Sequence, residues 1–346
     1  MKKIKSIVFL LLALSLIIAT AGCSNPSSNT SQNVQESDKQ TENTGNKDSV
    51  KVENIELKIR SGSTSGSWYP ATGVIAQFLP EDIPGITCTI TPGAGQSNAQ
   101  AIQDGTANFA FGKVAATFQG FNGETPFTEK TDKIRNLGYL YDEAWHLVVN
   151  ANSEINSIAD LKGKRLTTQT TGNLAEQMTR DVLEAYSLSY NDLKKVSFVG
   201  YEDSIQQMKD GIVDAFAFAT ATPASALVDL GSARDVKIIP IEPDKIDTII
   251  SATEGYLKRT IEAGTYDNQS EDILTIGSAI HMMVSSDMSE DMAYKITKSI
   301  YENIDRIGES HATYLGLTPE KMAIDLGFEY HPGALKYFNE IGVTVK

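Results

Sequence analysis

The sequence predicts an α/β fold built from two similar lobes. Segments of alternating apolar residues lead into glycine-rich loops and then into amphipathic helices, an order that is typical of parallel sheets flanked by helices. This order occurs twice: "IQDGTANFAFG" (Ile102–Gly112) and "MKDGIVDAFAF" (Met208–Phe218) both place an Asp-Gly pair before a Phe/Ala strand. Asp104 and Asp210 are 106 residues apart. The repeat favours two lobes over a single large sheet, which is the alternative.

The N-terminal segment has the features of a bacterial lipoprotein signal. Lysines precede the apolar run Ile7–Ile18, which is too short to span a bilayer, so residues 1–22 are predicted to be a secretory signal. The "TAGCS" that follows resembles a lipobox, with lipidation expected at Cys23, although Thr20 replaces the usual larger aliphatic residue. An ordinary signal followed by a chance cysteine is the alternative. Residues 23–50 lack aromatic residues and predict a disordered tether.

Composition restricts the possible partners. The net charge of −14 argues against nucleic acid, which requires a basic surface. It does not argue against a small anionic ligand, because a cleft can have a local field of its own. After lipidation only Cys88 would remain, so no internal disulfide is expected.

The elements of the two units follow in order. In the first unit, the strand Ile55–Ser61 leads to "GSTSGSWYP" and a helix whose apolar face contains Val74, Ile75, Phe78 and Leu79. In the second, Gly163–Gln169 leads to "TTGNLAE" and a helix whose apolar face contains Leu174, Met178, Val182 and Leu183. We expect residues 51–147 and 246–346 to form lobe I and residues 148–245 to form lobe II. Residues 246–346 are predicted to be mostly helical.

Several kinds of chemistry lack the residues they require. The histidines show no metal-ligand spacing, so we expect no metal and place them at the surface or at helix caps; they are His146, His281, His311 and His331. "GSTSG" superficially matches the nucleophile elbow, but Thr64 occupies the position of the serine, and no lysine follows to make a phosphate loop. "PGAGQSNA" lacks the third small residue of a dinucleotide site, since Asn98 stands there. We therefore expect neither a cofactor nor an enzyme.

Three loops share one design. Residues 62–69, 93–98 and 170–176 each carry glycine with Ser, Thr or Asn directly before a helix. A helix start presents unpaired N–H groups and a positive dipole end, which together suit a carboxylate. Each of these residues could equally be a simple helix cap. Trp68 and Tyr69 could form the wall of a pocket or pack in the core.

The chain resembles the TAXI family, the solute receptors of tripartite ATP-independent periplasmic (TRAP) transporters. The resemblance covers nearly all of residues 55–343 and rests on "GSTSGSWYP", "GAGQSNAQAIQDGTANFAFG", "INSIADLKGKRL", "MKDGIVDAFAFATATPAS", "IEAGTYDNQSEDILTIG" and "HPGALKYFNEIG". It implies a periplasmic-binding-protein fold of the second structural type, with mixed, mainly parallel sheets flanked by helices and a ligand cleft between two lobes joined by crossing strands. It also implies capture of small organic anions outside the cell, and several members of the family look like receptors for glutamate or glutamine. The ligand would be delivered to membrane subunits driven by an ion gradient.

The resemblance further implies which residues line the cleft. Carried over to this chain, they are Ser63, Thr64, Trp68, Tyr69, Gln96, Ser97, Asn98, Thr171, Gly172 and Asn173. The chain departs from the family at Lys113-Val114-Ala115, where relatives often carry a polar run, and at "QTTGNLA", where relatives carry more glycine. Lys113 could be a cation for a second carboxylate, or a lysine whose stem covers apolar surface.

Three hypotheses follow. The first is a monomeric, lipid-anchored receptor for a small carboxylate, either an acidic amino acid or a dicarboxylate, that serves TRAP membrane subunits. The second is a secreted α/β hydrolase or transferase, which the missing nucleophile–base pair disfavours. The third is a sensory lipoprotein with the same fold.

Overall fold

The computed structural model describes residues 54–64 and 66–346. The predicted signal, Cys23 and the predicted tether lie outside these residues. Lys51–Lys346 form one compact unit. None of the helices in the described part of the chain combines the length and the hydrophobicity that crossing a membrane requires.

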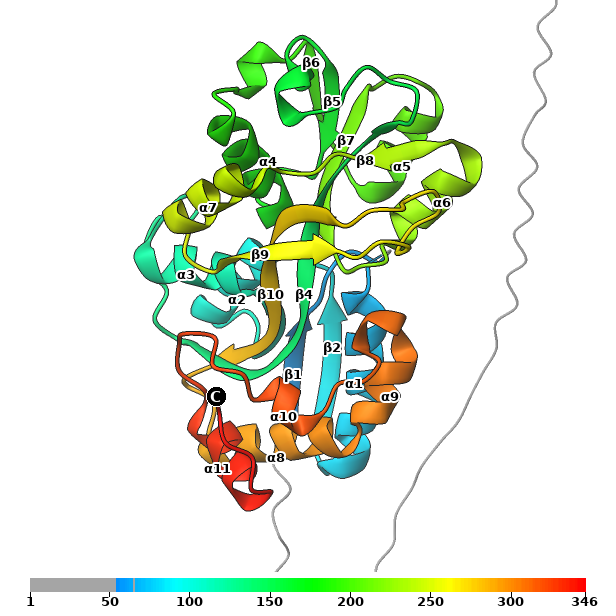
Figure 1. Cartoon of the computed structure of the whole chain (residues 1–346). Helices are drawn as coiled ribbons and strands as arrows, with labels where there is room; N and C mark the ends of the chain where they lie inside the picture. Colours follow the sequence, from blue (N-terminus) through cyan, green and yellow to red (C-terminus); the bar gives the residue numbers. More distant parts are fainter. Residues whose placement is uncertain (1–53, 65) are drawn as a thin grey trace, which may run out of the picture. The chain divides into compact units, whose positions relative to one another are not determined.

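The strands belong to one mixed sheet (Figure 1). They are β1 Ile55–Arg60, β2 Ile86–Thr91, β3 Phe109–Lys113, β4 Ile134–Asn150, β5 Arg165–Thr168, β6 Lys195–Phe198, β7 Ala215–Thr220, β8 Val236–Ile238, β9 Tyr256–Ile261 and β10 Ile273–Ser285. The α-helices are α1 Trp68–Asp82, α2 Gly95–Gln103, α3 Val114–Asn122, α4 Leu174–Ala185, α5 Tyr201–Lys209, α6 Ser225–Ala233, α7 Pro243–Ala252, α8 Glu290–Glu302, α9 Ile304–Ser310, α10 Pro319–Met322 and α11 Pro332–Glu340.

Strand order shows how the two repeated units are connected. The order is β2-β1-β3-β10-β4-β7-β5-β6, with β8 beside β4 and β9 beside β10. The pairs β1–β2, β1–β3, β5–β6 and β5–β7 are parallel, whereas β10 and β4 pair antiparallel with each other and with their neighbours β3 and β7. The predicted α/β class is confirmed as a mixed sheet flanked by helices. Parallel pairing is restricted to the two outer groups, because the long strands β4 and β10 run against them.

The predicted ends of the repeated helices are confirmed. Helix α2 is followed by Asp104 and Gly105, and helix α5 is followed by Asp210 and Gly211. Both glycines have a positive φ, +69° and +68°, a backbone conformation that is unfavourable for residues with a Cβ. The left-handed residue turns the chain back, and the buried strands β3 and β7 follow in the same way in the two units.

The expectation that residues 246–346 are mostly helical is wrong for their first part. Strands β9 and β10 occupy much of it, and β10 lies in the middle of the sheet. Its sequence, ILTIGSAIHMMVS, is apolar on both faces, because helices cover both sides of a central strand. A continuous apolar run does not by itself distinguish such a strand from a buried helix.

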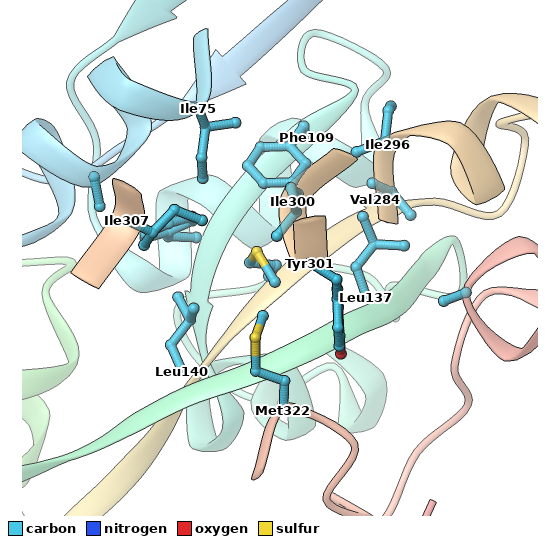
Figure 2. Close-up of a cluster of buried hydrophobic side chains, with 14 of the residues drawn as sticks. Ile75, Phe109, Leu137, Leu140, Val284, Ile296, Ile300, Tyr301, Ile307 and Met322 are labelled. Carbon is cyan, nitrogen blue, oxygen red and sulfur yellow. The ribbon is translucent and has the colours of Figure 1, made fainter. Parts of the chain in front are cut away.

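The largest core cluster lies against β1, β3, β4 and β10. Figure 2 shows side chains of α1, α8, α9 and α10 directed toward those of the sheet. The labelled residues are Ile75, Phe109, Leu137, Leu140, Val284, Ile296, Ile300, Tyr301, Ile307 and Met322. A second cluster, built around β5, β7 and α4, contains the apolar face predicted for the second unit: Leu174, Met178, Val182 and Leu183 are all buried. Each repeated unit therefore packs its own apolar face, although the sheet is continuous.

Candidate functional site

A cavity of about 260 Å³ lies where residues of both repeated units meet. This volume is close to the lower end of the range for small-molecule sites, about 300–1,000 Å³. Its lining consists of Gly62, Ser63, Gly66, Ser67, Trp68, Gly93, Ala94, Gly95, Lys113, Tyr141, Glu143, Gln169, Thr170, Asn173, Gly200, Tyr201, Glu202, Ala219 and Thr220.

The topology of the sheet explains why these residues meet. Two sets of three parallel strands, which run in opposite directions, deliver their carboxyl ends to the cavity: β1, β2 and β3 from the first unit, and β5, β6 and β7 from the second. Ligand sites of α/β proteins form at such ends. The remaining wall comes from β4, on which Tyr141 and Glu143 are two positions apart and therefore share a face.

Helices α1, α2, α4 and α5 begin at the cavity, and Lys113, the N-cap of α3, lines it as well. Helix α1 contributes Ser67 and Trp68, α2 contributes Ala94 and Gly95, α4 contributes its cap Asn173, and α5 contributes Gly200 and Tyr201. Their unpaired N–H groups and dipoles make the cavity favourable for an anion. Helices α1 and α2 carry no acidic residue in the first turn, whereas α4 and α5 do. Of these four helices, α1 and α2 are the two whose positive ends are not offset by a carboxylate of their own first turn.

Asn98 holds the first two loops together without lining the cavity itself. Its side chain is fully buried, and Nδ2 donates to Ser61 O at 2.7 Å and to Phe111 O at 2.9 Å. Helix α2 is thereby tied to the end of β1 and to the middle of β3. A Cβ at Gly93 would lie 2.0 Å from Asn98 Oδ1, so only glycine fits above this side chain. Asn98 acts beneath the cavity and does not line it.

Trp68 belongs both to the cavity wall and to the core. Its ring is 7% exposed and packs edge-on against Phe111. Its Nε1 donates to Tyr141 Oη at 2.8 Å, and this hydroxyl also makes a 3.0 Å hydrogen bond with Ser67 Oγ. The wall is therefore braced from α1 to β4, with the hydroxyl of Ser67 engaged by a tyrosine.

Lys113 and Glu143 form a buried ion pair in the lining. Lys113 Nζ lies 2.8 Å from Glu143 Oε2, and the side chains are 7% and 2% exposed. Burial raises the pKa of Glu143, and the Lys113 ammonium partly opposes that rise. Oε1 of Glu143 accepts no hydrogen bond from any described residue. The pair places both signs of charge in the cavity, but the lysine already has a partner.

The second unit supplies an amide beside a helix cap. Asn173 Oδ1 accepts from Ala175 N at 3.0 Å and caps α4, as its sequence position indicates. Glu176 does not complete a capping box, since it pairs with Arg180 at 2.9 Å instead. Gln169, at the end of β5, is 3% exposed, and its Nε2 donates to no acceptor among the described residues.

The residues expected from the sequence divide into two groups. Ser63, Trp68, Lys113 and Asn173 line the cavity. Thr64, Tyr69, Gln96, Ser97, Asn98, Thr171 and Gly172 are not among its lining residues. Gln96 is buried and donates to Gln119 Oε1 at 2.7 Å, and Ser97 is exposed and bonds the backbone of Ala94. The latter group shapes the loops whose backbone reaches the cavity.

Some lining residues were missed from the sequence. Gly200–Glu202 follow β6 and open α5 in the pattern of the other three loops, so the repeat itself could have indicated this fourth loop. Tyr141 and Glu143 lie within a 17-residue strand, and nothing in its pattern separates them from their neighbours. Only the antiparallel pairing of β4 with β10 and β7 brings them to the cavity.

The expectation for the histidines is right for two and wrong for two. His311 and His331 accept hydrogen bonds as helix caps. His146 and His281 are fully buried in the central strands β4 and β10. Burial lowers the pKa of His146 to about 4 and that of His281 to about 3. Among the described residues there is no cluster of three His, Cys, Asp or Glu side chains that could hold a metal ion.

Solved structures similar to this chain include three binding or transport proteins. The periplasmic aliphatic sulphonate binding protein of Escherichia coli is 16% identical, with a TM-score of 0.44 over 82% of this chain and 78% of its own. A putative L-cystine ABC transporter protein of Listeria monocytogenes is 16% identical, with a TM-score of 0.47 over 75% and 96%. An ancestral arginine-binding protein is 18% identical, with a TM-score of 0.46 over 77% and 100%.

A comparison with family models gives a match over most of the chain. The model of the NMT1-like family matches residues 59–342, which include every residue that lines the cavity. The protein therefore belongs to the NMT1-like family.

Proposed function

We propose that this protein is an extracytoplasmic receptor that captures a small organic anion and has no catalytic role. The observation that carries this proposal is the convergence of four helix starts and Lys113 on one cavity of about 260 Å³. Helix N-termini bind carboxylates through backbone N–H groups without any bond being made or broken. The cavity volume suits a ligand of the size of an amino acid or a dicarboxylate.

The lining favours binding over catalysis. No histidine is among the described residues that line the cavity, so a hydroxyl there has no imidazole base. Ser67 Oγ is engaged by Tyr141. A receptor for a small solute also agrees with the similar structures, which are a sulphonate-binding protein, a putative L-cystine transporter protein and an arginine-binding protein.

The finer points of the proposal rest on the sequence. The motifs shared with TAXI receptors point to glutamate, glutamine or a dicarboxylate as ligand and to TRAP membrane subunits as partner. The segment around Cys23 points to a lipid anchor at the cell membrane. We propose that residues 51–147 with 246–346 form one lobe, that residues 148–245 form the other, and that the two close on the ligand.

A thermal-shift screen of residues 24–346, which contain the whole compact unit, tests the proposal. A ligand that binds only the folded state stabilises it by about 2.7 kcal/mol at 100 times its dissociation constant. We expect at least one amino acid, monocarboxylate or dicarboxylate to raise the melting temperature by several degrees at millimolar concentration. If no small carboxylate moves the transition, the receptor proposal fails.

A further inference from the structure

Glu143 is the least expected residue in a cavity that suits anions. It lies on β4 with 2% of its side chain exposed, among four helix starts that favour negative charge. A buried carboxylate without full hydrogen bonding is destabilising, because one of its oxygens loses its hydrogen bonds to water and gains none from the protein. One oxygen, Oε2, is bonded to Lys113, and Oε1 is left without a donor among the described residues.

The charges of the lining argue against a ligand with two carboxylates and no ammonium. Glu143 already neutralises Lys113, and the other acidic residue of the lining, Glu202, is exposed at the start of α5. A dianion would therefore bring two negative groups to a cavity whose described cation is paired. One carboxylate is accommodated by the starts of α1 and α2, which carry no acidic residue in the first turn.

Two buried polar atoms of the lining lack hydrogen-bond partners among the described residues, and they indicate which groups a ligand would carry. Glu143 Oε1 needs a donor, and Gln169 Nε2 needs an acceptor. Both residues line the cavity and both are more than nine-tenths buried. A ligand that carries an ammonium together with a carboxylate satisfies both atoms, whereas a ligand made only of carboxylates satisfies Gln169 and leaves Glu143 without a donor.

We propose that Glu143 is a specificity-determining residue that selects ligands carrying an ammonium beside their carboxylate. This inference rests on the proposed receptor function and refines it. Ligands with an ammonium bind, and carboxylates of the same skeleton that lack the ammonium are rejected. Sites built to hydrogen-bond a polar group discriminate strongly against an analogue that lacks it, because the protein group is left buried and unpaired.

Two pairs of ligands isolate the ammonium. L-glutamate is compared with glutarate, and L-glutamine with glutaramate, by titration calorimetry on residues 24–346 at one pH and ionic strength. The members of each pair differ only at the α-amino group. We expect the member with the ammonium to bind at least about 100-fold more tightly in a pair that binds.

Variants then assign this preference to Glu143. Glu143→Gln keeps the shape and removes the charge, and it should reduce the preference to below about 10-fold, mainly by weakening the amino acid. Because this change leaves Lys113 without its counter-ion, the neutral double variant Lys113→Gln/Glu143→Gln is measured alongside it, with circular dichroism as a check of folding. Glu202→Gln is the matched control: it removes an exposed carboxylate of the same lining and should alter both members of a pair alike.

The outcomes separate this inference from the receptor proposal. If glutarate or glutaramate binds as well as its amino counterpart, the role of Glu143 is refuted while the receptor proposal stands. A preference that survives unchanged in a folded Glu143 variant also refutes it. If all four ligands and the wider carboxylate screen show no binding, the receptor proposal fails and this inference fails with it. If neither variant folds, the wild-type pairs alone decide, since equal binding refutes the selection.

Discussion

At the scale of single residues, the loops owe their geometry to side chains that lie beneath them. Asn98 donates to the carbonyls of Ser61 and Phe111 and so fixes the end of β1 and the middle of β3 relative to α2. Its neighbour Ser97 is exposed and bonds only the backbone of Ala94. Two adjacent polar residues, both plausible ligand contacts by sequence, thus serve the structure in different ways and with different energetic weight.

Substitution of Asn98 should be costly for stability. Asn98→Ala removes a buried donor from the carbonyls of Ser61 and Phe111, and we expect the free energy of unfolding to fall by about 1–3 kcal/mol. Ser97→Ala, the control, should cost at most about 1 kcal/mol because water can replace its exposed contacts. Urea unfolding followed by circular dichroism measures both. Equal losses for the two variants would show that Asn98 does not clamp the strands.

At the scale of elements, the same helix–turn–strand unit is used twice. Helices α2 and α5 both end at an Asp-Gly pair whose glycine has a positive φ, and both lead into a fully or nearly fully buried strand. The turn sends β3 and β7 back parallel to β1 and β5, so their carboxyl ends meet at the cavity. The turn glycines do not line the cavity, but they determine where the carboxyl ends of β3 and β7 lie.

Gly211 tests the importance of this turn. A Cβ at Gly211 meets no atom within 4 Å, so Gly211→Ala isolates the backbone cost of a left-handed residue, about 1–2 kcal/mol. Gly231→Ala is the matched control, because this glycine lies inside α6 in equally open space and without a positive φ. The control should be neutral or stabilising by up to about 1 kcal/mol. Equal decreases in the free energy of unfolding for both variants, relative to the wild type, would contradict this account.

At the scale of the whole molecule, the buried His146 connects the central strand β4 with segments that are distant in the sequence. His146 on β4 donates from Nδ1 to Ala144 O, since a carbonyl only accepts, and its Nε2 accepts from Tyr266 Oη at 2.9 Å. The same hydroxyl accepts from Ala224 N at 2.8 Å. The network requires a neutral ring, and burial lowers the pKa of His146 to about 4.

The pH dependence of stability follows from this lowered pKa. Below about pH 6.5 the unfolded chain protonates its histidine while the folded chain does not, so protons favour unfolding. Stability due to His146 is complete above pH 6.5 and is lost between pH 6.5 and 4, to a total of about 3 kcal/mol.

His146→Gln isolates the contribution of this histidine to acid unfolding. The variant should be less stable at neutral pH but should lose about 3 kcal/mol less than the wild type between pH 7 and 4, because carboxylates contribute equally to both. Urea unfolding at a series of pH values measures the difference. Parallel pH curves for the two proteins would show that His146 is protonated in the folded state as easily as in the unfolded one.

The sequence by itself determined the α/β class, the repeated unit, both Asp-Gly helix ends and the loops that open α1, α2 and α4. These features are local: a helix face, a turn glycine or a cap depends on residues a few positions apart. Strand β10 was missed because a central strand, covered on both faces, has no alternation to reveal it.

Only the tertiary structure decided which side chains meet in the cavity. Lys113 and Glu143 are 30 positions apart and on different strands, and the antiparallel pairing of β10 with both β3 and β4 brings them to 2.8 Å. Their burial, and the oxygen left without a donor, depend on packing from both repeated units. The charge and the burial of a site depend on segments that are far apart in the sequence. Whether the ligand carries an ammonium beside its carboxylate could therefore be argued only from the folded structure.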